Sequence, residues 1–288
     1  MNMTERTFDT GELKLHVLEG ERNGTPLLLL HGATGCADDW QPLQALLEPH
    51  WHIFAVDLRG HGRSDRAQGG PSGYHISGFV RDTIALLCAL FDQPGVLVGH
   101  SWGALTSMLT AAELGRASAE GGAPNPLRAV VAEDPPVMIY RGGPEMAPFM
   151  EFFGMMLQLK QSAKTYEEIL AALRALNTPS QELAPEEALP FWAQNMYNLD
   201  SDFLRAVLAG QEPVRGIDFK TVFTTIDRPM LLMQADMAKM GAFPDQDLAL
   251  VQSQVPKAQH VYFPDTSHMI HAEKPEAFVH ELVKFAGK

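Results

Sequence analysis

The segment Val96-Leu97-Val98-Gly99-His100-Ser101-Trp102-Gly103-Ala104 joins an aliphatic run to a helical pattern with almost no loop between them. The aliphatic run predicts a buried strand, and the residues from Ala104 onward predict a helix. Between them lies a G-x-S-x-G pattern. So tight a turn strains the backbone of its central residue, and side chains in place of the flanking glycines would clash. The pattern therefore predicts that Ser101 stands above a sheet edge at a helix N-terminus, as a nucleophile.

Short apolar runs alternate with helical patterns on both sides of this turn. The predicted strands are 13–19 (a half-buried edge strand), 27–30, 52–56, 96–98, 129–132, 230–233 and 260–263. The predicted helices are 43–47, 76–91, 104–114 and one that begins at Pro275. Continuous apolar strands alternating with helices are typical of a parallel sheet covered on both faces. We therefore expect an α/β fold with a mostly parallel, doubly wound sheet.

One region interrupts this alternation. Residues 135–228 contain no convincing strand and show helical patterning at 147–159, 166–176, 190–199 and 202–209. We interpret the region as a helical insertion between two strands of the sheet. The predicted organisation is a core domain made of residues 1–134 and 229–288, with a helical cap (lid) domain at 135–228.

The composition excludes several classes of function. The 288 residues include 22 Lys and Arg against 35 Asp and Glu, a net charge of −13, which disfavours binding to nucleic acid or to an anionic membrane. No apolar stretch approaches 18 residues, so no membrane-spanning helix is expected. The N-terminal residues lack the apolar run of a secretory signal, and two cysteines do not make a disulfide framework. We expect a cytoplasmic protein with a small-molecule substrate; the composition does not indicate an oligomeric state.

A nucleophilic serine needs a general base. His268 follows the last predicted strand, so it should emerge at the carboxyl edge of the sheet, as Ser101 does. His271 is the second candidate for the base. Its alternative role is that of a polar residue that covers the start of the next helix.

These motifs together resemble the α/β-hydrolase superfamily. The resemblance rests on His31-Gly32, on the run from Asp57 to Asp65 (DLRGHGRSD), on Gly99–Gly103 and on His268 with Pro275. It implies the α/β-hydrolase fold and an oxyanion hole made of two backbone amides. The first is that of Trp102, and the second is that of Ala33, with Gly32 as the alternative. The run from Asp57 to Asp65 is expected to brace the edge of the sheet.

The acid of the expected Ser-His-acid triad departs from the usual family pattern. Family members usually place it after the seventh strand, where this chain has Ala238, which cannot orient a histidine. The alternative family position follows the sixth strand and aligns with Asp134, as in haloalkane dehalogenases and zearalenone-type lactonases. The resemblance therefore favours Asp134 as the residue that accepts the His268 N–H. Four other candidates remain open: Glu133, Asp236, Asp245 and Asp247.

The insertion is rich in methionine and aromatic side chains, which suit an adaptable apolar pocket. Trp192 is the first candidate for substrate contact, because Phe191-Trp192-Ala193 resembles a cap segment of the zearalenone-type lactonases. Met138, Tyr140 and Met237 are further candidates. The insertion shows no cluster of Arg or Lys, which disfavours a highly anionic substrate. We expect no cofactor and no metal, since His268-x-x-His271 is only a weak zinc signal.

The sequence thus predicts a serine hydrolase that cleaves a moderately sized, largely apolar carboxylic ester or lactone through an acyl-enzyme. Serine at position 101 excludes the covalent route that uses an aspartate nucleophile. Two alternatives remain: a C–C bond hydrolase of ring-cleavage dienoates, and a non-catalytic ligand receptor on the same fold.

Overall fold

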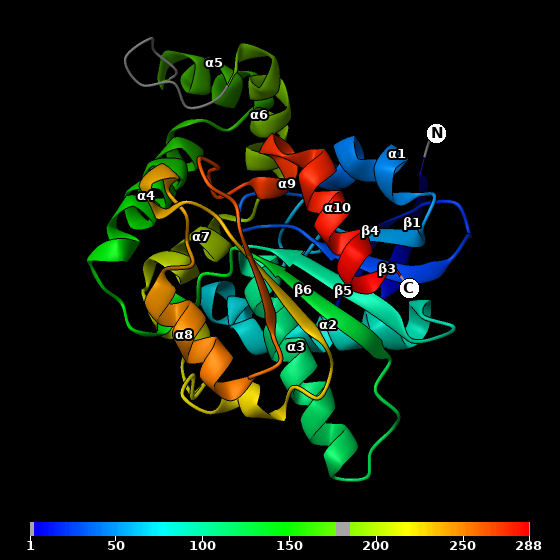
Figure 1. Ribbon diagram of the computed structural model, residues 1–288. Coiled ribbons are helices and arrows are strands. Elements are labelled where there is room, and N and C mark those ends of the chain that lie inside the picture. Colours follow the sequence, from blue (N-terminus) through cyan, green and yellow to red (C-terminus); the bar gives the residue numbers. More distant parts are fainter. Residues whose placement is uncertain (1–2, 177–184, 288) are drawn as a thin grey trace.

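The computed structural model describes residues 3–176 and 185–287, which contain one eight-stranded sheet (Figure 1). Its strands along the chain are β1 (Thr4–Asp9), β2 (Lys14–Glu19), β3 (Thr25–Leu30), β4 (Trp51–Val56), β5 (Gly95–His100), β6 (Leu127–Glu133), β7 (Met230–Gln234) and β8 (Gln259–Tyr262). Their order across the sheet is β1-β2-β4-β3-β5-β6-β7-β8. The strands from β4 to β8 in this order pair in parallel, and only the β1–β2 and β2–β4 pairs are antiparallel. The mostly parallel sheet that the apolar runs predict is confirmed.

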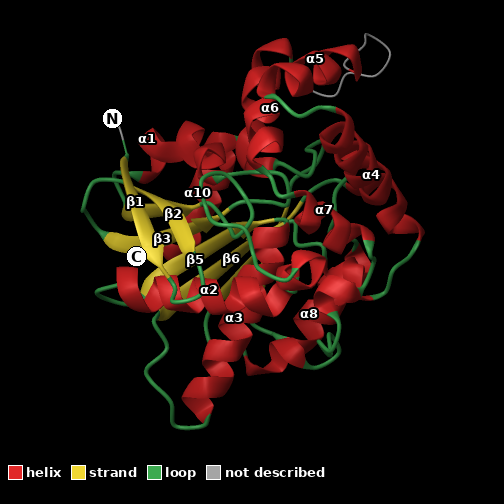
Figure 2. Ribbon diagram, turned by 180° about the vertical axis from the view of Figure 1, so that it is seen from behind, coloured by secondary structure: helices red, strands yellow, loops and turns green. Residues whose placement is uncertain are grey.

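Helices flank this sheet and fill the connections between its strands (Figure 2). They are α1 (Gln44–Leu47), α2 (Ile76–Leu90), α3 (Trp102–Ala119), α4 (Ala147–Ser162), α5 (Tyr166–Leu176), α6 (Leu189–Asn198), α7 (Ser201–Leu208), α8 (Asp245–Gln254), α9 (Ile270–Glu273) and α10 (Pro275–Ala286). No helix in the described part of the chain is both long enough and apolar enough to cross a membrane.

The sheet is buried on both faces because its central strands are apolar at every position. In β3, Leu27 and Leu29 belong to one hydrophobic cluster, and Leu28 and Leu30 belong to the other. Successive side chains of a strand point to opposite faces, so these clusters are the two faces of the sheet. Residues of α1 and α10 pack into the first cluster, and residues of α2 and α3 pack into the second.

The N-terminal edge of the sheet differs from the prediction. The run 13–19 is not an edge strand, because β2 lies between β1 and β4 and is buried over most of its length. The actual edge is β1, whose sequence Thr4-Glu5-Arg6-Thr7-Phe8-Asp9 is polar and largely exposed. A strand that buries so little carries no hydrophobic pattern to predict it. The helix α8 was likewise not predicted; its alternation of apolar and polar residues gives little amphipathic signal.

The connection between β6 and β7 contains α4 to α7. It contains no strand within its described residues, 135–176 and 185–228. In Figure 1, α5 and α6 project beyond the sheet layer. The division into core and lid remains a prediction that rests on this arrangement.

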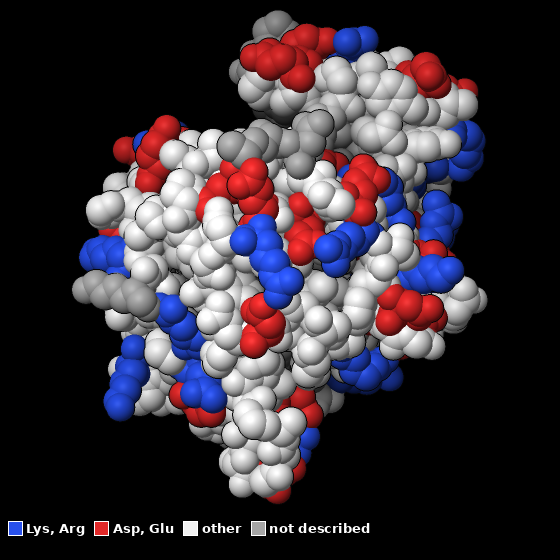
Figure 3. Space-filling view, turned by 90° about the vertical axis from the view of Figure 1, so that its right-hand side faces the viewer, with Lys and Arg blue, Asp and Glu red and all other residues white. Residues whose placement is uncertain are grey.

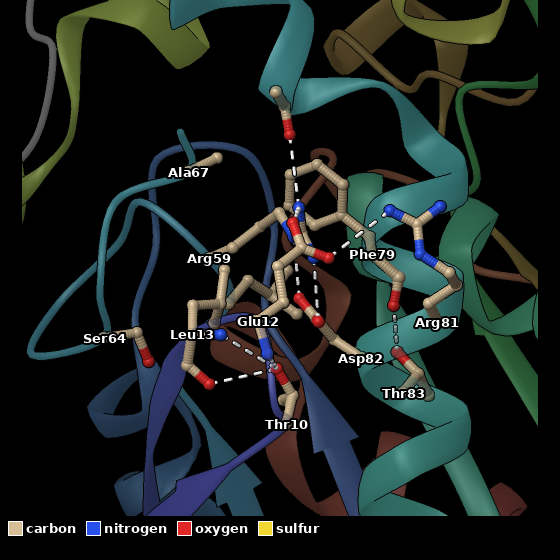
Figure 4. A network of polar contacts seen from close by, with 12 residues as sticks. Thr10, Glu12, Leu13, Arg59, Ser64, Ala67, Phe79, Arg81, Asp82 and Thr83 are labelled. Carbon is tan, nitrogen blue, oxygen red and sulfur yellow. Dashed lines mark hydrogen bonds and ion pairs between the residues drawn. The ribbon is translucent and has the colours of Figure 1, made fainter. Parts of the chain in front are cut away.

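Arg59, in the turn after β4, is buried and anchors the turn to neighbouring elements (Figure 4). Its guanidinium donates to both carboxylate oxygens of Asp82, at 2.7 and 2.8 Å, and to Glu12 at 3.2 Å. The ring of Phe79 lies 5.8 Å from the guanidinium carbon. A buried guanidinium needs such partners, because an unpaired charge in the interior is costly.

Candidate functional site

Ser101 occupies a strained turn between β5 and α3. Its backbone angles are φ 53° and ψ −118°, a conformation that side-chain-bearing residues rarely adopt. A Cβ atom on Gly99 would lie 2.2 Å from the carbonyl oxygen of Gly103, and one on Gly103 would lie 2.4 Å from that of Leu30. The flanking positions therefore have room only for glycine, as the motif predicts. The turn presents the Ser101 side chain at the N-terminus of α3.

His268 lies in the loop after β8 and reaches this serine. Its Nε2 atom is 2.7 Å from Ser101 Oγ. The His268 backbone carbonyl accepts a hydrogen bond from His100 Nε2 at 3.0 Å, which ties the loop to the residue before the serine. The structure thus brings together two residues that are 167 positions apart in the chain.

Asp134 completes a hydrogen-bonded chain. Its Oδ2 atom lies 2.6 Å from His268 Nδ1, and its side chain is fully buried. The carboxylate also accepts from the backbone amides of Ala235 at 3.0 Å and Ala242 at 2.6 Å. Asp134 has a positive φ of 47°, which turns the chain sharply at the end of β6. Three donors therefore fix the orientation of the carboxylate that faces the imidazole.

The other candidate acids have different partners. Asp236 is two residues short of the usual family position and caps a turn, accepting from the amides of Ala238 at 2.9 Å and Asp265 at 3.3 Å. These hydrogen bonds, that of Ala238 foremost, hold the pKa of Asp236 below its usual value. The remaining three are bound elsewhere: Glu133 to His271, Asp245 to Gln234 and Asp247 to Arg141.

His271 forms a second, deeper carboxylate–imidazole pair with Glu133. Its Nδ1 lies 2.9 Å from both Glu133 oxygens, and its backbone amide donates to Glu133 Oε1 at 2.8 Å. Ligand atoms of Glu133, His271 and His100 lie within 4.8 Å of one another, so these residues are the one group in the described chain suited to a metal ion. Glu133 binds His271, the ring of His271 lies 4.9 Å from that of His100, and His100 Nε2 donates to the His268 carbonyl, so the group supports the loop that carries His268.

The turn from His31 to Ala33 lies beside the serine. His31 is fully buried, and its Nδ1 donates to the Gly32 carbonyl at 2.7 Å while its Nε2 accepts from the Leu58 amide at 2.9 Å. Burial, reinforced by nearby His61, lowers the pKa of His31 to about 3, so this imidazole is neutral. In a trans peptide the C=O and N–H groups point in opposite directions. The bond to the Gly32 carbonyl therefore fixes the direction of the Ala33 N–H.

His61 also supports this turn. Its Nε2 lies 2.9 Å from the Ala33 carbonyl, and its Nδ1 lies 2.9 Å from the Arg59 carbonyl. Asp57, at the end of β4, accepts from the backbone amides of Ala37 at 2.6 Å and Arg63 at 2.9 Å. The run from Asp57 to Asp65 thus braces the segment that follows β3.

The residues predicted to contact substrate are placed differently from one another. Trp192 stacks on Phe152 at 6.0 Å, Met138 is buried in the hydrophobic cluster and Met237 is exposed. The side chain of Tyr140 lies outside what the structure describes. The insertion instead brings Phe149, on α4, against His268, with the ring centroids 5.5 Å apart. Sequence reasoning did not single out Phe149, because one aromatic residue among many in the insertion carries no distinguishing signal.

Comparison with known proteins places the chain in a family. A family model described as the alpha/beta hydrolase family matches residues 27–281. A 2-(acetamidomethylene)succinate hydrolase of Mesorhizobium japonicum is 25% identical, covering 97% of this chain and 94% of the relative. A pimeloyl-[acyl-carrier protein] methyl ester esterase of Vibrio vulnificus is 26% identical, covering 92% and 95%.

Solved structures share the same fold. An E-2-(acetamidomethylene)succinate hydrolase superposes with a TM-score of 0.71 at 22% identity, covering 98% of both chains. The enol-lactonase from Burkholderia xenovorans LB400 also gives 0.71, at 20% identity, covering 97% of this chain and 99% of that one. At this identity the likeness establishes the fold alone. With the family model matching most of its length, the chain belongs to the alpha/beta hydrolase family.

Proposed function

We propose that this protein is a serine hydrolase that cleaves a carboxylic ester or lactone of a moderately sized apolar substrate. The observation that carries the proposal is the hydrogen-bonded chain from Ser101 Oγ through His268 to Asp134, at 2.7 and 2.6 Å. Nucleophile, base and orienting carboxylate in this order are the parts that acyl transfer to serine requires.

The geometry supports a two-step reaction. Ser101 Oγ attacks the carbonyl carbon while His268 Nε2 takes its proton, and the Asp134 carboxylate stabilises the imidazolium. The Trp102 amide, one of the orphan donors in the first turn of α3, and the Ala33 amide stabilise the oxyanion. His268 then returns the proton to the departing alkoxide, which leaves an acyl-serine. Water that gives a proton to His268 attacks this ester and releases the acid, and the same proton returns to Ser101.

Intact-mass spectrometry after exposure to a fluorophosphonate probe tests the nucleophile. We expect one adduct on the wild type, none on Ser101→Ala, and slow labelling of Asp134→Asn. Ser107, buried in α3, provides a control variant, Ser107→Ala, which should still be labelled. An adduct that persists in Ser101→Ala, or an unlabelled folded wild type, would refute the proposed nucleophile.

A substrate panel separates the alternatives. It contains aryl esters, lactones, a coloured dienoate and 2-(acetamidomethylene)succinate, the compound in the name of a relative that matches 97% of the chain. Repeated turnover of esters or lactones supports the proposal. Bleaching of the dienoate without ester turnover would indicate a C–C bond hydrolase, and about one event per protein molecule would indicate a ligand receptor.

A further inference from the structure

A cavity of about 460 Å³ lies away from Ser101, between the loop after β4 and the helices of the insertion. Eleven residues line it. Four of them are cationic, and none is acidic: Arg63, Arg66, Lys160 and Lys164. Lysine and arginine make up only 22 of the 288 residues of this acidic chain, so four among eleven is a clear local enrichment. On the face shown in Figure 3, by contrast, charged side chains of both signs are interspersed.

This cationic cluster is assembled by the fold. Arg63 and Arg66 come from the turn after β4, whereas Lys160 and Lys164 come from the end of α4 and the residues that follow it. The two pairs are about a hundred residues apart in the sequence. Inspection of the insertion alone therefore finds no cationic cluster.

Among the residues that the structure describes, three of the four charges have no carboxylate partner within hydrogen-bonding distance. Arg63 is neutralised by Glu5 and Asp38. Lys164 Nζ donates to the Lys160 carbonyl at 3.0 Å, and no hydrogen bond or ion pair joins the Arg66 guanidinium to another described residue.

Lys160 is the most enclosed of the four. Its Nζ donates to the backbone carbonyls of Met196 and Tyr197, the latter at 3.0 Å, which leaves its charge without an anion. Burial, and then the charge of Arg66, lower the pKa of Lys160 to about 8. Three ammonium hydrogens with two acceptors leave one donor available.

Two acidic residues of the adjoining segments, Asp200 and Glu168, are not among the residues that line the cavity. Asp200 accepts from the Tyr74 hydroxyl at 2.6 Å and from the Asp202 amide at 3.0 Å. Glu168 accepts from the backbone amides of Lys164 at 2.6 Å and Thr165 at 3.1 Å. The lining of the cavity itself therefore carries positive charge only, and it retains unused N–H donors.

We propose that this cavity binds the phosphate group of a small molecule, held by Arg66, Lys160 and Lys164. A guanidinium presents a planar pair of donors that matches phosphate oxygens, and ammonium groups add point charges. The cavity exceeds the size of a bare phosphate and falls within the range of small-ligand pockets. The bound group would bridge the core turn and the insertion. This site is independent of the chemistry proposed for Ser101.

Isothermal titration calorimetry on the full chain, at constant ionic strength, tests the site with two classes of probe. Inorganic phosphate and pyrophosphate represent the free ion, and adenosine monophosphate represents an organic phosphate. We expect saturable binding of at least one probe, weakened tenfold or more in Arg66→Gln and in Lys164→Gln. Arg174→Gln, which removes an exposed α5 guanidinium outside the cavity, should bind as the wild type does. Stronger binding of either class supports the site and identifies its source.

A second measurement keeps the test independent of folding defects in the variants. Sulfate is a dianion with no proton to exchange near neutral pH. Its binding to the wild type should raise the Lys160 pKa and therefore take up protons at pH 8 but not at pH 6.5. This uptake is measured by comparing buffers of different ionisation enthalpy. Absence of saturable binding by phosphate, pyrophosphate and adenosine monophosphate, or equal loss in Arg174→Gln, would overturn the proposal, whereas proton uptake at pH 8 would support Lys160 as one of the binding residues.

Discussion

His271 Nδ1 lies 2.9 Å from both carboxylate oxygens of Glu133, and the next residue along the chain, Asp134, contacts His268 Nδ1 at 2.6 Å. Two successive residues at the end of β6 thus each hold a histidine of the segment that follows β8. The side chains of the deeper pair are almost fully buried. Because the Ser101 amide donates to the Glu133 carbonyl at 2.9 Å, the same residue also ties the serine turn to β6.

Replacing Glu133 by Gln should destabilise the fold by about 3–5 kcal/mol, because it leaves a buried imidazolium without its counter-charge. Burial alone lowers the pKa of His271, but the charge and hydrogen bond of Glu133 outweigh it and raise the pKa above its usual 6.5. The stabilisation from this raised pKa is complete below pH 6.5 and is lost as pH rises through the folded-state value. Urea unfolding at pH 6 and pH 9 measures both effects.

Glu113→Gln is the control for this variant. Glu113 forms an exposed pair with Arg116, and such pairs contribute about 0–1 kcal/mol. A change below 1 kcal/mol in Glu133→Gln at pH 6 would contradict the importance of the buried pair.

Asp134→Asn should lower kcat for ester hydrolysis by about 10³–10⁴-fold, because the amide no longer stabilises the imidazolium or fixes its tautomer. Asp236→Asn should keep activity within about threefold, since the Asp236 carboxylate accepts from the Ala238 and Asp265 amides and the described contacts of His268 do not include it. Steady-state kinetics on one aryl ester give the ranking. If Asp236→Asn were the more damaged enzyme, the acid would have to be reassigned.

His31→Ala should lower kcat by about 10–100-fold with little change in KM, because the Ala33 N–H loses the hydrogen bond that fixes its direction. The effect belongs to transition-state stabilisation, so labelling by the fluorophosphonate should slow in parallel. The loss should be the same across the neutral pH range, since the low pKa of His31 keeps it uncharged throughout.

His52→Gln is the matched control, because His52 is another buried histidine, paired with Glu19 at 2.8 Å. It lies near the start of β4, whereas His31 follows the end of the parallel strand β3. The His52→Gln variant should lose stability without losing kcat in the folded fraction. Equal kcat in His31→Ala and wild type would refute the positioning role of His31.

The sheet and the Ser101–His268 contact were predictable because both leave local signals. A strand buried on both faces is apolar at every position, and the serine turn demands glycine at 99 and 103 for steric reasons visible in the sequence. The polar strand β1 was not predictable, since its residues pair only through the backbone with β2. The strand β1 forms only because β2 lies beside it, and the sequence of residues 4–9 alone does not indicate this pairing.

The choice among acids lay at the limit of sequence reasoning. Ala238 at the usual position removed one option, but Glu133 and Asp134 are adjacent and chemically equivalent in the sequence. The family alignment favours Asp134, and in the structure the backbone separates the two residues: the chain turns at the positive φ of Asp134, and the two side chains contact different histidines. The cationic cavity was not predictable for a related reason, since its two halves meet only in the folded chain.

Asp82→Ala should lower the free energy of unfolding by about 3–5 kcal/mol, because it removes the bidentate partner of the buried Arg59 guanidinium. Glu12, at 3.2 Å and half exposed, is a poor substitute. Arg81→Gln tests exposed charge in the same network and should change stability by less than about 1 kcal/mol. Urea unfolding of the three proteins decides, and comparable losses in both variants would show that burial does not matter here.

Asp39→Asn should flatten the pH dependence of stability between pH 4 and pH 6. Burial raises the pKa of Asp39 to about 6, against the opposing charge of His271 and the hydrogen bond from the Cys36 amide. A raised folded-state pKa gives stability that is complete below 3.8, the ordinary value, and is lost as pH rises to about 6. A difference of about two pKa units corresponds to about 3 kcal/mol. We therefore expect the stability of Asp39→Asn relative to wild type to be up to about 3 kcal/mol greater above pH 7 than at pH 4.

Asp218→Asn should behave in the opposite way. Asp218 is exposed, and hydrogen bonds from the Thr221 hydroxyl and the Lys220 amide hold its pKa below the usual value. The Asp218 carboxylate therefore stabilises the fold above pH 3.8 and loses this effect in acid. We expect Asp218→Asn to be less stable than wild type at pH 7. Unfolding curves between pH 4 and pH 7.5 measure both variants, and carboxyl-carbon NMR gives the Asp39 titration directly. A midpoint for Asp39 near 4 would contradict the prediction, because the carboxylate would then be charged in the folded protein despite its burial.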